Sequence, residues 1–300
     1  MNIEVIENFN AKNLTSFKVS GQISKAYFPK SAEELIFLLS TLKNPLVLGN
    51  CSNILISSDG YNGEVIFTTK CNSIKVENTK IYAECGVKGP MASKVAKDSG
   101  LSGFEFMIGF PGSIGGEIYM NASAQGQAIS DFLISATVFD MDIKKKIKLS
   151  KEDLKFEYRH SICQDKKYVI VSAEFELQKD LQEKIDEKMQ YNLNFRRNHQ
   201  PSLALPNCGS VFKNPENNSA GRLLDSVGAK NFSVGNAKVW ENHANFIINN
   251  GATSLDILNL MLLMYNKVEE THNIKLKPEV IYIGNNSEKE AKIWKTLKQK

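Results

Sequence analysis

The segment GFPGSIGGEIYMNA, residues 109–122, restricts the possible folds more than any other part of this chain. It places four glycines and a proline within eight positions and then returns to apolar residues. A tight turn with unusual backbone angles is one explanation for such a run. The other is close approach by a ligand or by another stretch of backbone, which a Cβ atom would block. The segment therefore predicts a loop that belongs to a binding site or to a tight packing contact.

A second loop favours the binding interpretation. PLVLG at 45–49 predicts a short buried strand that runs directly into NCSN at 50–53. Ser52 and Asn53 offer a hydroxyl, an amide and backbone N–H groups to an anion. Two loops of this kind are suited to hold a diphosphate between them. Neither has the G-x-G-x-x-G spacing of a Rossmann turn, and no P-loop sequence occurs, so a different diphosphate scaffold is expected.

The periodic segments predict a mixture of helices and strands. Ser31 and Glu34 form a capping box before an apolar helical pattern, which predicts a helix over 32–43. Pro90 suits a first helical turn and Gly100 a C-terminal cap, so a second helix is expected between them. Alternating or continuous apolar runs predict strands at 45–49, 64–69, 73–78, 80–86, 132–140, 144–150 and 168–177.

The character of the sequence changes at residues 180–198, which predict a long polar helix followed by a loop. We place a domain boundary there, between 1–188 and 189–300, with subdomains of about 1–70 and 71–188 in the first part. The second part predicts the order helix, strand, helix, strand, at 220–228, 244–250, 254–273 and 279–284. The helix at 254–273 is expected to bury one face, formed by Leu255, Leu258, Leu262, Tyr265 and Val268.

Composition excludes several classes of function. A net charge of +4, spread along 300 residues, is too weak to indicate nucleic-acid binding. No segment approaches the ~20 apolar residues of a membrane span and no leader pattern begins the chain, so a cytoplasmic protein is expected. Five cysteines without a C-x-x-C pair argue against a disulfide framework and a zinc site. No metal is expected, because the four histidines do not cluster with other ligands.

Taken with several later motifs, the two loops resemble the family of UDP-N-acetylenolpyruvoylglucosamine reductases, flavoenzymes of bacterial cell-wall synthesis often called MurB. LGNCSNILI and GFPGSIGGEIYMNA are similar to its two FAD loops, and YRHS, PNCGSVFKNP, HANFIIN and PEVIYIG follow in family order. The resemblance implies an α+β fold: an FAD-binding module like that of p-cresol methylhydroxylase over 1–188 and a substrate-binding domain over 189–300. The chain looks like the shorter type II form.

The resemblance also implies which residues contact FAD. They are Gly49, Asn50, Cys51, Ser52, Asn53, Gly109, Pro111, Gly112, Ser113, Ile114, Gly115, Gly116, Asn121 and Ala122. FAD is expected to bind noncovalently, because all four histidines follow the two loops. Asn50, Cys51, Ser20 and Ser123 depart from the small or glycine residues usual in the family, and each adds a Cβ near the expected cofactor.

The reaction implied by the resemblance has two halves: NADPH gives a hydride to FAD, and reduced FAD then reduces UDP-N-acetylglucosamine enolpyruvate to UDP-N-acetylmuramate. Charge develops at the α-carbon and its carboxylate, so the site needs a cation and a proton donor. Arg159 is the candidate cation, Ser210 the candidate proton donor, and Glu279 a candidate hydrogen-bonding or protonated partner of the intermediate. Their alternative structural roles are a surface ion pair, a turn hydroxyl and a solvated carboxylate.

The UDP-sugar is expected to contact Tyr158, Lys213 and Asn214, with Arg196 or Arg197 at the nucleotide phosphates unless that pair is only a solvated helix end. Two other functions stay open at this stage. One is a sugar or alcohol oxidase or dehydrogenase on the same FAD scaffold, which has no need for Ser210. The other is a nonenzymatic nucleotide-binding module, in which the glycine loops hold UDP or FAD without turnover.

Overall fold

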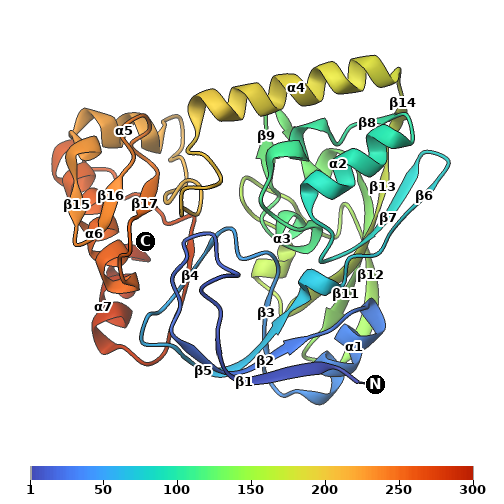
Figure 1. Ribbon diagram of the computed structural model, residues 1–300, viewed down its shortest axis with the longest axis horizontal. Coiled ribbons are helices and arrows are strands. Elements are labelled where there is room, and N and C mark those ends of the chain that lie inside the picture. The colour runs from blue at the N-terminus through green and yellow to red at the C-terminus, as the bar shows by residue number, and fades with distance from the viewer. Residues whose placement is uncertain (1, 300) are drawn as a thin grey trace. The chain divides into compact units, whose positions relative to one another are not determined.

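The computed structural model describes residues 2–299, which form two compact units (Figure 1). The first unit comprises Met1–Ile6, Ala26–Asn50 and Glu64–Arg196, and the second comprises Glu7–Lys25, Cys51–Gly63 and Arg197–Lys300. Both contain helices and strands, as predicted. The division between Arg196 and Arg197 lies inside one long helix, α4 (Gln182–His199). The functional boundary expected near residue 188 stays a prediction.

Helix α1 (Ala32–Thr41) begins where the capping box predicted. The Ser31 hydroxyl accepts a hydrogen bond from the Glu34 amide, and the Glu34 carboxylate accepts one from the Lys30 amide. Helix α2 (Gly89–Asp98) likewise has Pro90 in its first turn, and Gly100 beyond its end adopts a left-handed φ of 65°. Local capping residues therefore set the ends of both helices.

A five-stranded antiparallel sheet is the centre of the first unit, in the order β12-β11-β13-β7-β6. Its strands are β6 (Ile74–Glu77), β7 (Lys80–Glu84), β11 (Leu133–Asp140), β12 (Lys145–Ser150) and β13 (Tyr168–Glu176). Helices α2 and α3 (Ile114–Tyr119) lie against it (Figure 1). The shared core includes Leu35 of α1, Ile118 of α3, Val138 of β11 and Phe175 of β13, all buried. The glycine-rich segment is thus attached to a rigid support.

A four-stranded sheet has the order β1-β2-β5-β3, where β3 pairs in parallel with β5. Its strands are β1 (Glu4–Asn10), β2 (Gln22–Phe28), β3 (Leu46–Leu48) and β5 (Tyr61–Phe67). Two short antiparallel pairs complete the strands around the first unit. They are β8 (Leu101–Ser102) with β14 (Gln178–Lys179), and β9 (Ser123–Ala124) with β10 (Gln127–Ala128).

The second unit combines three helices with two small sheets. The helices are α5 (Ala220–Ser226), α6 (Ser254–His272) and α7 (Glu288–Leu297). Strand β4 (Ile54–Ile56) pairs in parallel with β18 (Ile281–Ile283), and β15 (Ser233–Val234), β16 (Ala237–Val239) and β17 (Ile247–Asn249) form an antiparallel sheet. Because β4 and β18 lie far apart in sequence, their pairing connects the segment that follows the loop at 50–53 to the C-terminal part of the chain.

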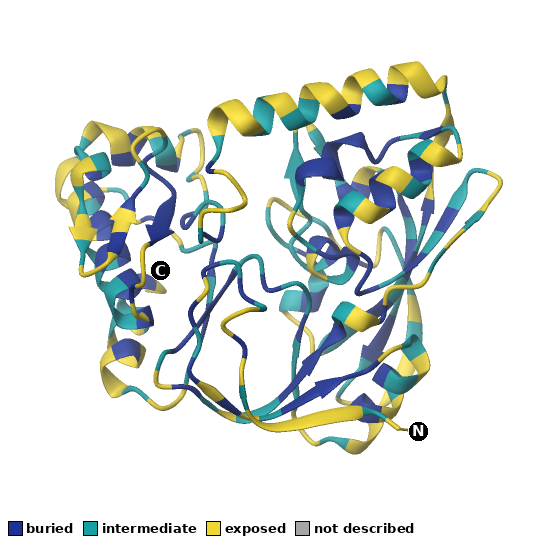
Figure 2. Ribbon diagram, in the orientation of Figure 1, coloured by how far each residue is buried: buried dark blue, intermediate teal, exposed yellow. Residues whose placement is uncertain are grey.

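The predicted buried face of α6 is partly wrong. Leu258, Tyr265 and Val268 are buried as expected, whereas Leu255 and Leu262 are only half-buried. Ile257, Leu260, Met261 and Met264 are buried as well, so the helix turns its core face toward these positions. Polar helix α4 behaves as predicted: only Ile185 and Met189 are buried, and Figure 2 shows most of its surface exposed. Helix α7 was not predicted.

None of the helices within residues 2–299 combines the length and apolar character needed to cross a bilayer. The five cysteines are buried thiols. Across the same residues, no three histidine, cysteine or carboxylate side chains gather as a metal site.

Candidate functional site

Backbone hydrogen bonds join the glycine-rich segment to residues 85–89. The amides of Ile114 and Gly115 donate to the carbonyls of Val87 and Cys85, both at 2.8 Å. A Cβ on Gly115 would lie only 2.9 Å from the Cβ of Cys85, a distance that forces one of the two to move. Close packing against Cys85 therefore explains Gly115 without any ligand.

Other groups of the same loop point to a ligand. Ser113 is 1% exposed and precedes α3, yet its hydroxyl has no hydrogen-bond partner anywhere in residues 2–299. No backbone carbonyl within that range accepts a hydrogen bond from the amides of Gly112 and Ser113. A Cβ on Gly49 would lie 2.4 Å from the Ser113 hydroxyl oxygen. An unsatisfied buried hydroxyl is costly, and this one lies beside glycines and backbone amides, an arrangement that fits an anionic ligand such as a diphosphate.

The two predicted FAD loops meet within the first unit. The side-chain amide of Asn50 donates to the carbonyl of Pro111, joining the first loop to the second. The rest of the first loop belongs to the second unit, where Cys51 has a left-handed φ of 50° and is buried. Burial raises the pKa of the Cys51 thiol to about 12, so it remains protonated at neutral pH. Ser52 is half-buried in the same loop.

Asn121 and Ala122 follow α3 and connect the glycine-rich segment to its neighbours. Asn121 adopts a left-handed φ of 42° and its side-chain amide donates a 3.0 Å hydrogen bond to the carbonyl of Glu157. The Ala122 amide donates to the Glu117 carbonyl at 2.8 Å. Hydrogen bonds to Glu157 and to Glu117 of α3 therefore hold the end of the glycine-rich segment in place.

Glu117, which was not predicted, is a buried acid in this region. It is 3% exposed, and neither carboxyl oxygen has a hydrogen-bond partner among the described residues. Burial raises the pKa of its carboxyl to about 8, so the acid is mostly neutral at pH 7. Its Oε1 atom lies 2.6 Å from the position that a Cβ on Gly89 would occupy, and 2.9 Å from the corresponding position on Gly112. A charged residue inside an otherwise glycine-rich and apolar motif was the sequence signal for it.

Arg159 lies at the tip of a tight turn in the first unit. Its backbone has a left-handed φ of 55°, and its guanidinium lies 5.3 Å from the ring centre of Tyr158. Nη1 donates a 2.8 Å hydrogen bond to the hydroxyl of Ser123. Arg159 is half-buried and Tyr158 is exposed, so both can reach a ligand.

The two arginines at the end of α4 differ in their surroundings. Arg196 is half-buried and its Nε donates a 2.9 Å hydrogen bond to the carbonyl of Gly109, while burial lowers the pKa of its guanidinium. Arg197 is exposed. Arg196 therefore supports the glycine-rich loop, whereas Arg197 has the exposure that a phosphate-binding side chain needs.

The second unit holds the remaining candidates on two paired segments. The Glu279 amide donates to the carbonyl of Val211, next to Ser210, and the Lys213 amide donates to that of Lys277, both at 2.8 Å. Ser210 and Glu279 are half-buried. The Asn214 side-chain oxygen accepts a 3.0 Å hydrogen bond from the Ala220 amide and so caps the start of α5. The structure thus brings Ser210, Lys213 and Glu279 together.

Cys208 lies two residues before Ser210 but is a poor acid. It is buried, and burial together with the charge of Glu279 raises the pKa of its thiol well above the usual value. Gly209 between them has a left-handed φ of 80°, and the Asn207 side chain accepts a 3.0 Å hydrogen bond from its amide. This turn keeps the thiol inside and leaves the Ser210 side chain partly accessible.

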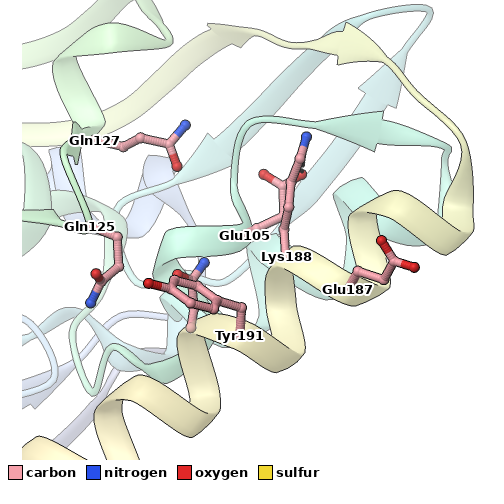
Figure 3. Close-up of a pocket in the computed structure, with 7 residues that line it drawn as sticks. Glu105, Gln125, Gln127, Glu187, Lys188 and Tyr191 are labelled. Carbon is pink, nitrogen blue, oxygen red and sulfur yellow. Dashed lines mark ion pairs between the residues drawn. The ribbon is translucent and has the colours of Figure 1, made fainter.

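A hollow of about 350 Å³ lies elsewhere in the first unit, along α4 (Figure 3). Its lining residues are Glu105, Gln125, Gln127, Glu187, Lys188, Tyr191 and Asn192, none of which was predicted as a site residue. Glu105 is already satisfied there by the Ser102 hydroxyl at 2.6 Å and the Gly103 amide at 2.7 Å. We assign no ligand to this hollow.

Comparisons with known proteins agree with the two-part organisation. The FAD binding domain family matches residues 24–142, and the C-terminal domain family of UDP-N-acetylenolpyruvoylglucosamine reductase matches residues 200–283. Reductases of that name from Caldicellulosiruptor saccharolyticus and Clostridium novyi are each 39% identical to this chain. They align over 292 and 290 residues, which cover 95% of the chain and 93% and 94% of the relatives.

A solved structure gives the same result. The crystal structure of UDP-N-acetylenolpyruvylglucosamine reductase from Thermus caldophilus matches with a TM-score of 0.79 and 28% identity, over 95% of this chain and 100% of that one. These matches confirm the predicted α+β fold class, the FAD-binding part with its separate C-terminal domain, and FAD as the cofactor.

Proposed function

The chain belongs to the UDP-N-acetylenolpyruvoylglucosamine reductase family of FAD-dependent enzymes in peptidoglycan precursor synthesis, and from that premise we propose its reaction. The substrate is UDP-N-acetylglucosamine enolpyruvate, the product is UDP-N-acetylmuramate, and NADPH is the hydride donor. Residues 1–188 bind FAD and residues 189–300 bind the UDP-sugar. A cytoplasmic location is part of the same proposal.

The observation that carries the proposal is the pairing between segments 210–213 and 277–279. It fixes Ser210 and Glu279 on adjacent backbone, because the Glu279 amide is bonded to the carbonyl that directly follows Ser210. The proton donor and the hydrogen-bonding partner that an enolate intermediate needs would then come from two segments joined by backbone hydrogen bonds.

FAD, once bound and reduced, supplies the hydride that the β-carbon of the enolpyruvyl group accepts. Negative charge then develops on the α-carbon and its carboxylate. Arg159 stabilises that charge, since its planar guanidinium matches a carboxylate. The Ser210 hydroxyl donates the proton to the α-carbon, because a carbanion next to a carboxylate is basic enough to take a proton from a positioned hydroxyl. Glu279, as a neutral acid or hydrogen-bonding partner, stabilises the intermediate.

Binding of the UDP-sugar falls to groups directed at anions. Tyr158, Lys213 and Asn214 contact the substrate, and the exposed Arg197 contacts the nucleotide phosphates. Arg196 is assigned instead to the cofactor loop, because its Nε is already bonded to the Gly109 carbonyl. In the cofactor loops, the unpartnered Ser113 hydroxyl and the amides beside it would hold the FAD diphosphate.

The two alternatives make different predictions. An oxidase or dehydrogenase on this scaffold would deprotonate an alcohol and would not depend on Ser210. A nonenzymatic nucleotide-binding module would bind FAD or UDP, and NADPH would not reduce the flavin.

The test is an anaerobic visible spectrum recorded before NADPH, after NADPH, and after UDP-N-acetylglucosamine enolpyruvate. We expect NADPH to bleach the flavin absorption and the enolpyruvyl substrate to restore it. Bleaching without recovery would leave a flavoprotein with another substrate. Absence of flavin even after reconstitution with FAD would overturn the proposal.

A further inference from the structure

The hydrogen bond from Arg159 to Ser123 connects the proposed carboxylate-binding group to the FAD region of the same unit. Arg159 Nη1 donates to the Ser123 hydroxyl oxygen at 2.8 Å. Ser123 begins β9, directly after the segment that ends at Ala122, and is not among the residues assigned to FAD, substrate or chemistry above. Its partner, Arg159, is the residue that stabilises the negative charge on the substrate in the proposed mechanism.

Both ends of this hydrogen bond are fixed by the fold. Ser123 pairs with Ala128 in the β9–β10 hairpin, and the Ile129 amide donates to the Ala122 carbonyl at 3.0 Å. On the other side, the Gln164 side-chain amide donates to the carbonyls of Arg159 and Tyr119, at 3.0 and 2.8 Å. The backbone of the arginine is therefore attached to the end of α3, and its head group is attached to β9.

The chemistry of the acceptor matters as much as its position. An arginine side chain has four rotatable bonds and loses substantial rotamer entropy when it is fixed. A hydroxyl acceptor selects one orientation of the guanidinium through a single N–H group. Because the hydroxyl is neutral, it does not cancel the positive charge, as an aspartate or glutamate at this position would.

We propose that Ser123 is a positioning residue for Arg159, which holds the guanidinium in the orientation that receives the substrate carboxylate. The proposal rests on the proposed function. Ser123 makes no contribution to hydride transfer from NADPH, and its effect is confined to the half-reaction in which charge develops on the substrate.

The test compares Ser123→Ala with Ser123→Thr, which keeps a hydroxyl, in single-turnover anaerobic mixing. We expect Ser123→Ala to keep the FAD dissociation constant and the rate of flavin reduction by NADPH within about twofold of wild type. Reoxidation of the flavin by the enolpyruvyl substrate should slow about tenfold, the consequence of about 1.4 kcal/mol of lost transition-state stabilisation. Ser123→Thr should recover most of that rate.

A double-mutant cycle separates positioning from a general effect on folding. In an Arg159→Ala background, Ser123→Ala should change the reoxidation rate by less than twofold, because the group that it positions has been removed. A further tenfold loss in that background would overturn the proposal, and so would a Ser123→Ala enzyme with wild-type reoxidation. Failure of the substrate to reoxidise the wild-type flavin would instead overturn the proposed function, and this inference with it.

Discussion

The side-chain amide of Asn53 donates a 2.8 Å hydrogen bond to the backbone carbonyl of Glu279, a residue 226 positions later in the chain. The Asn53 carbonyl in turn accepts a 3.0 Å hydrogen bond from the Ile281 amide. These two bonds begin the parallel pairing of β4 with β18. Asn53 was predicted as a cofactor-loop residue, and its side chain holds the backbone of a proposed catalytic residue.

Asn53→Ala should therefore destabilise the protein even without FAD. Removing the amide leaves the Glu279 carbonyl without this donor, which we expect to lower the free energy of unfolding by about 1 to 2 kcal/mol. Urea unfolding of the FAD-free protein measures this. Asn72→Ala, at an exposed position, is the matched control and should stay within about 0.5 kcal/mol of wild type. Equal midpoints for the two variants would show that the bond to Glu279 contributes nothing to stability.

Ser210→Ala should divide the two half-reactions. FAD reduction by NADPH should be nearly unchanged, whereas reoxidation by the enolpyruvyl substrate should slow by about a hundredfold or more, as expected for a lost general acid. Ser210→Cys should retain part of the activity, because a thiol can also donate a proton. Rapid mixing under anaerobic conditions measures both rates, with Ser202→Ala on the preceding exposed loop as control. An equal loss in both halves would contradict the role of Ser210 as proton donor.

The sequence predicted those parts of the fold that local rules determine. Ser31 and Glu34 located the start of α1, and Pro90 and Gly100 bracketed α2, because caps act within a few residues. Helix α7 escaped prediction because its docking depends on remote groups. Its buried Glu290 accepts hydrogen bonds from the hydroxyls of Ser57 at 2.6 Å and Tyr282 at 2.7 Å, and also from Ser254.

The candidate site divides in the same way. Motif spacing indicated the glycine loops, Arg159 and Ser210 as candidate site residues, since each lies in a short segment with its own signature. Motifs did not indicate that Arg196 bonds the Gly109 carbonyl or that Ser123 bonds Arg159. Those contacts join segments 87 and 36 residues apart, and tertiary packing alone determines them.

Glu117 should make stability depend on pH. Burial raises its pKa from 4.5 to about 8 in the folded state, so between these values the folded chain holds a proton that the unfolded chain has lost. The free energy of unfolding must then fall as pH rises through this window and level off above it. Glu117→Gln removes the titration. Between pH 6 and pH 8.5, the free energy of unfolding should fall by roughly 2 to 3 kcal/mol more in wild type than in this variant.

Urea midpoints of the FAD-free protein at the two pH values test this prediction. We compare the change in midpoint between the two pH values for wild type and variant. The contributions of all other titrating groups cancel in this comparison, because both proteins share them. Glu216→Gln, at an exposed position, is the control and should keep the wild-type pH dependence. If Glu117→Gln also kept it, the buried carboxyl would not be the titrating group.

Two neighbouring glycines should separate the packing role of the glycine-rich segment from its binding role. A Cβ at Gly115 would meet the Cys85 Cβ at 2.9 Å and the Cys85 carbonyl oxygen at 3.2 Å, so Gly115→Ala should lower the stability of the FAD-free protein by about 1 to 3 kcal/mol. A Cβ at Gly116 would meet only the Ser113 hydroxyl, at 3.8 Å, which is ordinary contact. Since Gly116 lies in α3, Gly116→Ala should leave stability unchanged or raise it by up to about 1 kcal/mol.

Measuring FAD binding as well as stability in Gly115→Ala and Gly116→Ala distinguishes the packing role from the binding role. The Ser113 hydroxyl is one of the groups that we assign to the diphosphate, so a methyl group placed beside it should hinder the cofactor. Gly116→Ala should therefore weaken FAD binding at least about tenfold while the FAD-free protein stays as stable as wild type. Fluorescence titration of FAD and urea unfolding measure the two quantities. Wild-type FAD affinity in Gly116→Ala would mean that the diphosphate does not approach this face of the loop, and the Ser113 hydroxyl would then need another partner.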